Sequence, residues 1–299
     1  MSPDPRNPIH QPPMTSRPVF FVVRYGLILL ALLIVLIPTV WMGTMAFKPF
    51  PEWTTATGDL SWLPKNLTWG NFEYIFTGQT EDLIVTLDRT AERPILASLL
   101  TAVLGTAIAV IVGTLGAYAV TRFKVGNNLP LSVLQLRLFP PLAVMIPVMI
   151  MWASLGMIDT WWGLSLIYGI VTLPFAFWLM KTFFDKVPIE IEEAALVEGC
   201  SRFRVFWKVT LPMVKEALAS TCLFVFILNW SDYLIALLLT RKDWVTIPVY
   251  MNSLASAMGG QMYRCKAALG LIVAIPPVVF GIAIQKYLVR GLTIEALKP

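Results

Sequence analysis

Long apolar runs without charged side chains constrain this chain more than any other feature. The runs 25–47 and 267–285 contain no Asp, Glu, Lys or Arg. A helix needs about 20 apolar residues to cross the hydrocarbon core of a bilayer, and both runs are close to this length. Only 14% of the 299 residues are charged, well below the roughly one quarter that is typical of soluble domains. The sequence therefore predicts an all-α integral membrane protein.

Four further apolar runs bring the predicted number of transmembrane helices to six. The six spans are 25–47, 95–121, 138–158, 160–180, 217–240 and 267–285. Prolines among polar residues predict that 1–24 is a disordered tail, because such a segment has too little apolar surface to repay ordering. We expect one membrane domain over 25–290 and a short tail over 291–299.

The distribution of basic residues predicts how the chain is oriented. Fourteen Lys and Arg residues lie in segments that six spans would place in the cytoplasm, against eight in the outer segments. Positive residues are retained inside, so both termini and the loop 188–212 are predicted to be cytoplasmic. The long loop 48–93, with seven acidic residues, is then extracytoplasmic. The net charge of +5 follows from this orientation and does not indicate nucleic-acid binding. The acidic stretch 77–92 has no role that the sequence identifies.

The cytoplasmic loop 188–212 has the pattern of a helix–turn–helix. Pro188 can open a first helix whose early turns hold three glutamates, which suits the positive end of the helix dipole. Gly199 permits a sharp turn, and Ser201 can cap a second helix that ends near Pro212. A solvated amphipathic hairpin and a docking surface for another protein are both compatible with this pattern.

Residues at fixed spacings in this loop resemble the EAA loop of permease subunits in binding-protein-dependent ABC importers. The matching positions are Glu193, Ala194, Ala195, Gly199, Val209, Leu211 and Pro212. In that family the first helix is a coupling helix that docks into a cleft on an ATPase subunit. The resemblance implies six transmembrane helices in the type I ABC importer architecture, in the bacterial inner membrane. It also implies a homologous second permease, two ATPase subunits, an extracytoplasmic solute-binding protein and transport by alternating access.

The energy source for transport is not encoded in this chain. No Gly-x-x-x-x-Gly-Lys-Ser/Thr phosphate loop occurs in it, so ATP and Mg²⁺ are expected on the partner ATPase. The three cysteines and the lone His10 have no metal-ligand spacing, and no nucleophile–base set indicates an enzyme. An ATPase-independent secondary carrier is the alternative from another class. Only Asp232 lies well inside a predicted span as a candidate coupling group.

A polar cluster in the fifth span is the candidate for contact with the transported solute. It consists of Asn229, Trp230, Asp232 and Tyr233. Planar polar groups beside aromatic rings suit sugars, which offer hydroxyls for hydrogen bonds and C–H faces for packing. The segment resembles the Trp-Asn-Asp/Glu-Phe/Tyr region of carbohydrate-uptake permeases of the maltose-transporter type, with Asn and Trp reversed. A sugar or glycoside is therefore the expected solute, and another polar solute is the alternative. The same side chains could instead bind helix backbone or the partner permease.

Overall fold

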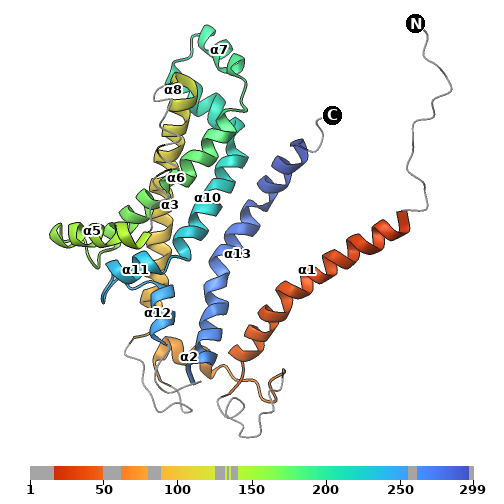
Figure 1. Cartoon of the computed structure of the whole chain (residues 1–299), viewed down its shortest axis with the longest axis vertical. Coiled ribbons are helices and arrows are strands. Elements are labelled where there is room, and N and C mark those ends of the chain that lie inside the picture. Colours follow the sequence, from red (N-terminus) through yellow and green to blue (C-terminus); the bar gives the residue numbers. More distant parts are fainter. Residues whose placement is uncertain are drawn as a thin grey trace.

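A computed structural model describes residues 17–49, 62–79, 89–124, 132, 135, 141–254 and 261–295. All regular elements within these ranges are helices, as the apolar runs predict. The short helices α7 and α8 lie at one end of the helix bundle, and α2 and α12 lie at the other (Figure 1). We call these the hairpin end and the far end.

Three helices form the centre of the bundle: α3 (Glu92–Phe123), α6 (Trp161–Phe184) and α10 (Lys215–Trp230). Glycines bring α3 and α6 into close contact. A Cβ atom at Gly105 would lie 2.6 Å from the Cβ of Tyr168, and one at Gly113 would lie 2.8 Å from the backbone nitrogen of Phe177. Any larger side chain would force the two helices apart. Gly105 and Gly113 therefore set the close approach of α3 and α6.

Two long helices flank this centre: α13 (Gln261–Glu295) and α1 (Arg17–Ala46). α1 meets α13 near the far end and then leans away from the bundle (Figure 1). Residues 20–40 of α1 are all exposed in this chain, and burial begins only near its end at Met45 and Ala46. A helix that is apolar all round needs a nonpolar environment, so this surface faces lipid or another membrane protein.

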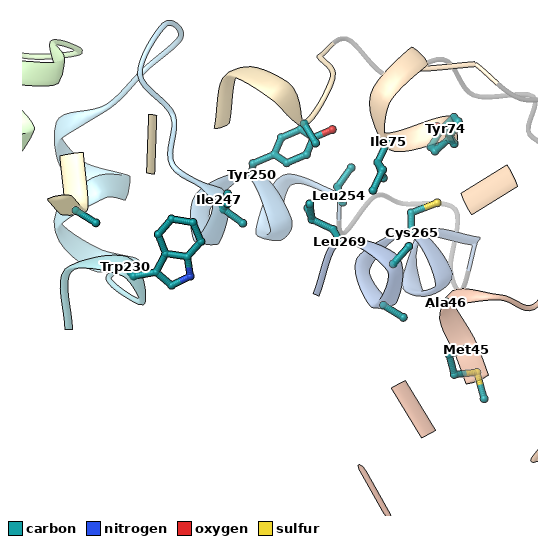
Figure 2. Close-up of a cluster of buried hydrophobic side chains, with 14 of the residues drawn as sticks. Met45, Ala46, Tyr74, Ile75, Trp230, Ile247, Tyr250, Leu254, Cys265 and Leu269 are labelled. Atoms are coloured by element: carbon teal, nitrogen blue, oxygen red, sulfur yellow. The ribbon is translucent and has the colours of Figure 1, made fainter. Parts of the chain in front are cut away.

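The far end is closed by the short helices α2 (Gly70–Thr77) and α12 (Ile247–Ser253). Figure 2 shows side chains of both helices meeting others from α1, α10 and α13 in one buried cluster. The amide of Asn71 adds a polar tie, because its Nδ2 donates to the carbonyl oxygens of Ala46 at 2.8 Å and Lys48 at 2.9 Å. The loop predicted over 48–93 therefore contains a helix that anchors the end of α1.

Asp159, in the turn between α5 (Pro141–Ser154) and α6, joins two segments at the far end. Its carboxylate accepts from the backbone N–H groups of Lys242 at 2.8 Å, Asp243 at 2.9 Å and Trp244 at 3.0 Å. Burial alone would raise the pKa of Asp159, but these backbone donors outweigh it and the pKa is lowered. Gly156 in the same turn has a positive φ of 67°, as expected of a tight turn. We call this carboxylate and its three donors the Asp159 clip.

The observed helices differ in length from some of the six predicted spans. Among the described residues, four helices (α1, α3, α6 and α13) are long and apolar enough to cross a membrane. α10 would count as a fifth only together with the helical segment Arg202–Met213, from which it is bent by 77°. α5 has 14 described residues, about 21 Å of helix, which is shorter than the predicted third span. Residues 138–140 of that span lie outside the described residues, and so do 1–16 of the predicted tail.

The ends of α1 and α13 also correct the predicted tails. α1 begins at Arg17 and α13 continues to Glu295, so residues 17–24 and 291–295 are helical. Pro18 falls in the first turn of α1, where proline is tolerated because its missing N–H has no partner there. Apolar runs mark the stretch that can lie in hydrocarbon, and a helix can extend beyond that stretch on both sides.

Candidate functional site

The loop 188–212 folds as the predicted helix–turn–helix. Its first helix is α7 (Ile189–Val197), and Gly199 turns the chain with a φ of +88°. The side chain of Ser201 then accepts from the N–H of Arg204 at 3.4 Å and caps the second helix. The second helix runs through α8 (Arg202–Val205), a π-helical turn (Phe206–Thr210) and α9 (Leu211–Met213). Both the turn and the cap are confirmed.

Several residues of the hairpin are exposed to solvent in this chain. Glu193, Ala194 and Gly199 are exposed, Ala195 is partly exposed, and Val197 is 89% exposed. An exposed valine next to alanines and a glycine makes a low, partly apolar surface that another helix or cleft can approach closely. We call Glu193, Ala194, Val197 and Gly199 the outward face of the hairpin.

One glutamate of α7 points the other way and holds the hairpin to the bundle. Glu192 is buried, and its Oε1 accepts from Nε of Arg122 at 2.8 Å. Its Oε2 accepts from the hydroxyl of Tyr118 at 3.0 Å. A second guanidinium nitrogen, Nη2 of Arg122, donates to the carbonyl oxygen of Val187 at 3.0 Å. We call Tyr118, Arg122 and Glu192 the hairpin anchor.

The anchor is buried and tightly packed. Only 8% of the Arg122 side chain and 6% of the Glu192 side chain are exposed. The ring of Tyr118 lies 4.7 Å from that of Phe206 and 5.6 Å from that of Phe184, measured between centroids. A buried ion pair is costly to break, because loss of one partner leaves an uncompensated charge. The anchor therefore fixes α7 and the π-helical turn to the end of α3.

The remaining residues of the motif belong to the second helix of the hairpin. Val209 is half-buried in the π-helical turn, and Leu211 packs against a buried cluster that includes Phe184 and Phe206. Pro212 is exposed near the end of α9, directly before the chain enters α10. Leu211 therefore supports the hairpin from the side of the bundle and is not part of the outward face.

The resemblance to the EAA loop predicts a role for Glu193, whereas the anchor was not predicted from the sequence. Glu192 is one of three acids at a helix N-terminus, where the dipole alone explains a negative charge. A signal was present in α3, because Tyr118 and Arg122 are four residues apart and share a helix face at its end. Their pairing with Glu192 joins positions about 70 residues apart, which spacing within one helix does not reveal.

The polar cluster of the fifth span lies where α10 ends, and the chain resumes as α11 (Leu234–Leu239). The helix of this span is interrupted at the polar cluster, and the residues of the cluster contact different neighbours. Nδ2 of Asn229 donates to Oγ1 of Thr106 on α3 at 3.2 Å. Nε1 of Trp230 donates to the carbonyl oxygen of Val273 on α13 at 3.2 Å. Both side chains are buried and serve the packing of the bundle.

The other two residues of the cluster are more open. Oδ2 of Asp232 accepts from the hydroxyl of Tyr168 and from the N–H of Ala236, each at 3.2 Å, so it also caps α11. Tyr233 is exposed, and its hydroxyl accepts from Nδ2 of Asn252 at 2.9 Å. The four predicted residues thus do not converge on one site, and Asp232 and Tyr233 are the two that a solute could reach.

Neither site has the composition of a metal centre. Within the described ranges, no group of three or more His, Cys, Asp or Glu side chains is arranged to hold a metal ion. Glu192 is occupied by its two donors, and Asp232 by its two. The geometry supports docking and polar contact, and it contains no arrangement for bond cleavage.

Comparison with known proteins gives one consistent family. Residues 105–294 match the family described as "Binding-protein-dependent transport system inner membrane component". The chain is 32% identical over 267 residues to the "Trehalose transport system permease protein SugB" of Mycobacterium tuberculosis (strain CDC 1551 / Oshkosh), which covers 88% of this chain and 92% of the relative. It is 33% identical to the "Trehalose/maltose transport system permease protein MalG" of Thermococcus litoralis, over 67% of this chain and 73% of the relative.

A solved structure has the same fold. It is described as the "Crystal structure of a bacterial ABC transporter involved in the import of the acidic polysaccharide alginate". The TM-score is 0.73 at 21% identity, and the match covers 94% of this chain and 100% of that chain. At this identity the likeness concerns the fold alone, and it agrees with the architecture predicted from the sequence.

The anchor leads to a prediction about stability. Arg122→Ala or Glu192→Ala should each lower the free energy of unfolding by about 3–5 kcal/mol, since each leaves a buried charge unpaired. The double variant should lose much less than the sum of the two. The ion pair Lys181–Asp185 is the matched control, at 2.7 Å with 24% and 46% of the side chains exposed. Its loss should cost about 0–1 kcal/mol.

Chemical unfolding of the detergent-solubilised chain, followed by tryptophan fluorescence, measures all of these differences. Additive losses for Arg122→Ala and Glu192→Ala, or losses equal to those of the control pair, would show that the anchor does not hold the hairpin.

Proposed function

The chain belongs to the binding-protein-dependent transport system inner membrane component family, and from this membership we propose how its hairpin and bundle work together. It is a multi-pass inner-membrane permease subunit of an ABC importer for sugars, and ATP is hydrolysed on a separate subunit. The chain itself is not an enzyme. The residues that couple ATP hydrolysis to transport, and those that contact the sugar, are the subject of this proposal.

The outward face of the hairpin is the coupling surface that meets the ATPase. The observation that supports this proposal is the difference in burial between two adjacent glutamates of α7. Glu192 is buried in the anchor, whereas Glu193 is exposed beside Ala194 and Val197. An exposed surface on a rigidly anchored helix can transmit force, because displacement of α7 must move α3 through Arg122. α3 in turn is packed against α6 through Gly105 and Gly113.

The proposed cycle follows from these contacts. Closure of the ATPase subunits pushes on the outward face of the hairpin. The anchor passes this displacement to α3, and α3 and α6 tilt as one unit because their close packing prevents sliding. A tilt of this unit relative to α10 and α13 changes which end of the bundle is open, which is alternating access. ATP and Mg²⁺ bind to the ATPase subunits, outside this chain.

The assembly contains further chains. Importers of this class combine permease, ATPase and solute-binding protein in general. For this chain we propose a homologous second permease and two ATPase subunits. The exposed apolar surface of α1 supports a second membrane-embedded subunit, because residues 20–40 of this helix are all exposed within the chain.

Both termini and the hairpin are placed in the cytoplasm by this proposal, with support from the distribution of basic residues. Labelling with a membrane-impermeant thiol reagent tests it. Cys265 is fully buried and unsuitable, so exposed positions are needed. In a Cys200→Ser background, Val197→Cys should react only in inverted vesicles, and Leu67→Cys only in intact cells. Labelling of both from one side would contradict the orientation.

The break between α10 and α11 is the proposed place where the chain touches the sugar. The ring of Tyr233 is exposed, and the Asp232 carboxylate lies one residue away and is only partly buried. An aromatic face beside a carboxylate can pack against sugar C–H groups and accept from hydroxyls. Asn229 and Trp230 have bundle partners and are assigned to structure.

This assignment predicts different effects for two variants. Tyr233→Ala should raise the KM for uptake about 5- to 150-fold, the factor that corresponds to roughly 1–3 kcal/mol for a lost polar or packing contact. Asn252→Ala removes only the hydrogen-bond partner of Tyr233 and should change KM less than about threefold. Uptake of radiolabelled sugar at several concentrations measures both. A normal KM for Tyr233→Ala would remove this residue from the pathway.

Two variants test the coupling surface: one reverses a charge, and the other changes the shape of the backbone turn. Glu193→Lys should lower uptake at least about tenfold, because a like-charge contact at a desolvated interface costs several kcal/mol and 1.4 kcal/mol is already a factor of ten. Gly199→Val should have a similar effect, because a β-branched residue resists the φ of +88°. Glu73→Lys and Gly281→Val make the same changes at exposed or open positions away from the hairpin.

The measurement is uptake per correctly inserted complex, together with the amount of ATPase that copurifies. The controls should keep normal values for both. Normal uptake by Glu193→Lys and Gly199→Val would mean that the hairpin is a solvated connector and that coupling occurs elsewhere.

A further inference from the structure

A cavity of about 370 Å³ opens at the far end, away from the hairpin and from the proposed sugar contact. It lies between the start of α3 and the segment that joins α11 to α12. Its lining residues are Arg89, Thr90, Arg93, Pro94, Lys242, Asp243 and Val245. Cavities of this size are large enough for a small polar group such as a phosphate with its substituents.

The lining is strongly basic. Arg89, Arg93 and Lys242 contribute three positive charges against the single carboxylate of Asp243. Nη1 of Arg89 donates to the carbonyl oxygen of Lys242 at 2.8 Å, which ties this guanidinium to the facing wall. Within the described ranges, none of the three cations forms an ion pair. Guanidinium and ammonium groups gathered in this way match the oxygens of a phosphate.

Both walls of the cavity are held in place by hydrogen bonds outside it. The Asp159 clip fixes the backbone of residues 242–244. The N–H of Ile247 donates to Oγ of Ser98 at 2.8 Å, which joins α12 to α3. The hydroxyl of Tyr250 donates to the carbonyl oxygen of Arg89 at 2.8 Å. The basic groups are therefore preorganised, and a ligand need not order the backbone to bind.

An exposed apolar stripe continues from the cavity along α3. Leu96, Leu100 and Val103 are 64%, 39% and 48% exposed, and their spacing of three and four residues places them on the face of Arg93. If a ligand placed a phosphate in the cavity, the rest of that ligand would lie next to this apolar stripe. Only an amphipathic anion uses both surfaces.

The depth of the cavity in the membrane is consistent with an amphipathic anionic ligand. Trp161 and Trp162 begin α6 at the same end and are both exposed, and tryptophan concentrates where a bilayer meets water. The Asp159 clip ties the turn just before these residues to the cavity wall at Lys242. The basic groups consequently lie near the depth of lipid phosphates.

From these observations we propose that the cavity binds the phosphate of an anionic glycerophospholipid, with an acyl chain lying along Leu96, Leu100 and Val103. Basic pockets beside membrane helices recognise such headgroups through charge and hydrogen bonds. The bound lipid would join the start of α3 to the segment before α12. This site is separate from the hairpin, so the lipid proposal can be tested independently of the coupling proposal.

Native mass spectrometry of the purified complete complex tests the site. The complex is delipidated in detergent and titrated with phosphatidylglycerol, with phosphatidylcholine of the same acyl chains, and with inorganic phosphate as a competitor. Arg93→Gln and Lys242→Gln remove one cavity charge each. Arg241→Gln removes the same charge from an exposed residue of the same segment that does not line the cavity.

The wild-type complex should retain phosphatidylglycerol in preference to phosphatidylcholine, and millimolar phosphate should not displace it. Arg93→Gln and Lys242→Gln should each weaken retention about fivefold, as expected for the loss of one basic contact to an anionic lipid. Arg241→Gln should leave it unchanged.

Four results would overturn the proposal. Equal retention of the two lipids, or an equal loss with Arg241→Gln, would mean that no specific headgroup site exists. Displacement by phosphate would mean that the cavity takes a free oxyanion and that the stripe on α3 has no part in binding. Unchanged lipid retention by the Arg93 and Lys242 variants, with weaker docking of the solute-binding protein, would identify the cavity as a protein contact.

Discussion

A buried ion pair between Arg122 and Glu192 connects the exposed hairpin to the long helices of the bundle. The pair joins segments about 70 residues apart, and the hydroxyl of Tyr118 and the carbonyl oxygen of Val187 satisfy further polar groups around it. In a low-dielectric setting such a pair holds its geometry because separation of the charges is costly. The position of α7, and with it the exposure of Glu193, depends on this contact. Force on the hairpin can therefore pass to α3 through this ion pair rather than through a flexible linker.

A second constraint comes from the membrane, where backbone polar groups need partners inside the protein. The chain breaks between α10 and α11, and Asp232 compensates by accepting from the N–H of Ala236 and from Tyr168. The break stays within the bundle because Asn229 and Trp230 bond to α3 and α13 on either side. An interrupted helix with its polar groups paired in this way exposes a small polar surface next to Tyr233, which suits contact with a sugar.

Sequence patterns predicted the features that depend on local chemistry. Apolar runs located the main helices, the positive φ at Gly199 and the cap at Ser201 follow from their residue types, and the polar interruption near Asp232 marked the break. Residue type alone, however, did not distinguish the buried Glu192 from the exposed Glu193 in the hairpin. Both are acids near a helix N-terminus, and only the three-dimensional position of Arg122 makes one an anchor and leaves the other exposed. The ends of the helices and the length of α5 could not be predicted either, because hydropathy indicates which residues lie in the membrane and not where a helix ends.

The central claim is that the anchored hairpin presents its outward face to the ATPase. Site-specific photo-crosslinking tests this contact directly, with a photoreactive amino acid in place of Val197, which is 89% exposed. A matched probe replaces Leu67, which is 76% exposed in the predicted extracytoplasmic loop. If the outward face docks on the ATPase, the probe at 197 should crosslink to the ATPase subunit in the assembled complex and the probe at 67 should not. Glu192→Ala should lower the crosslinking yield at 197. Absence of an ATPase crosslink at 197 in a complex that transports sugar normally would contradict the central claim.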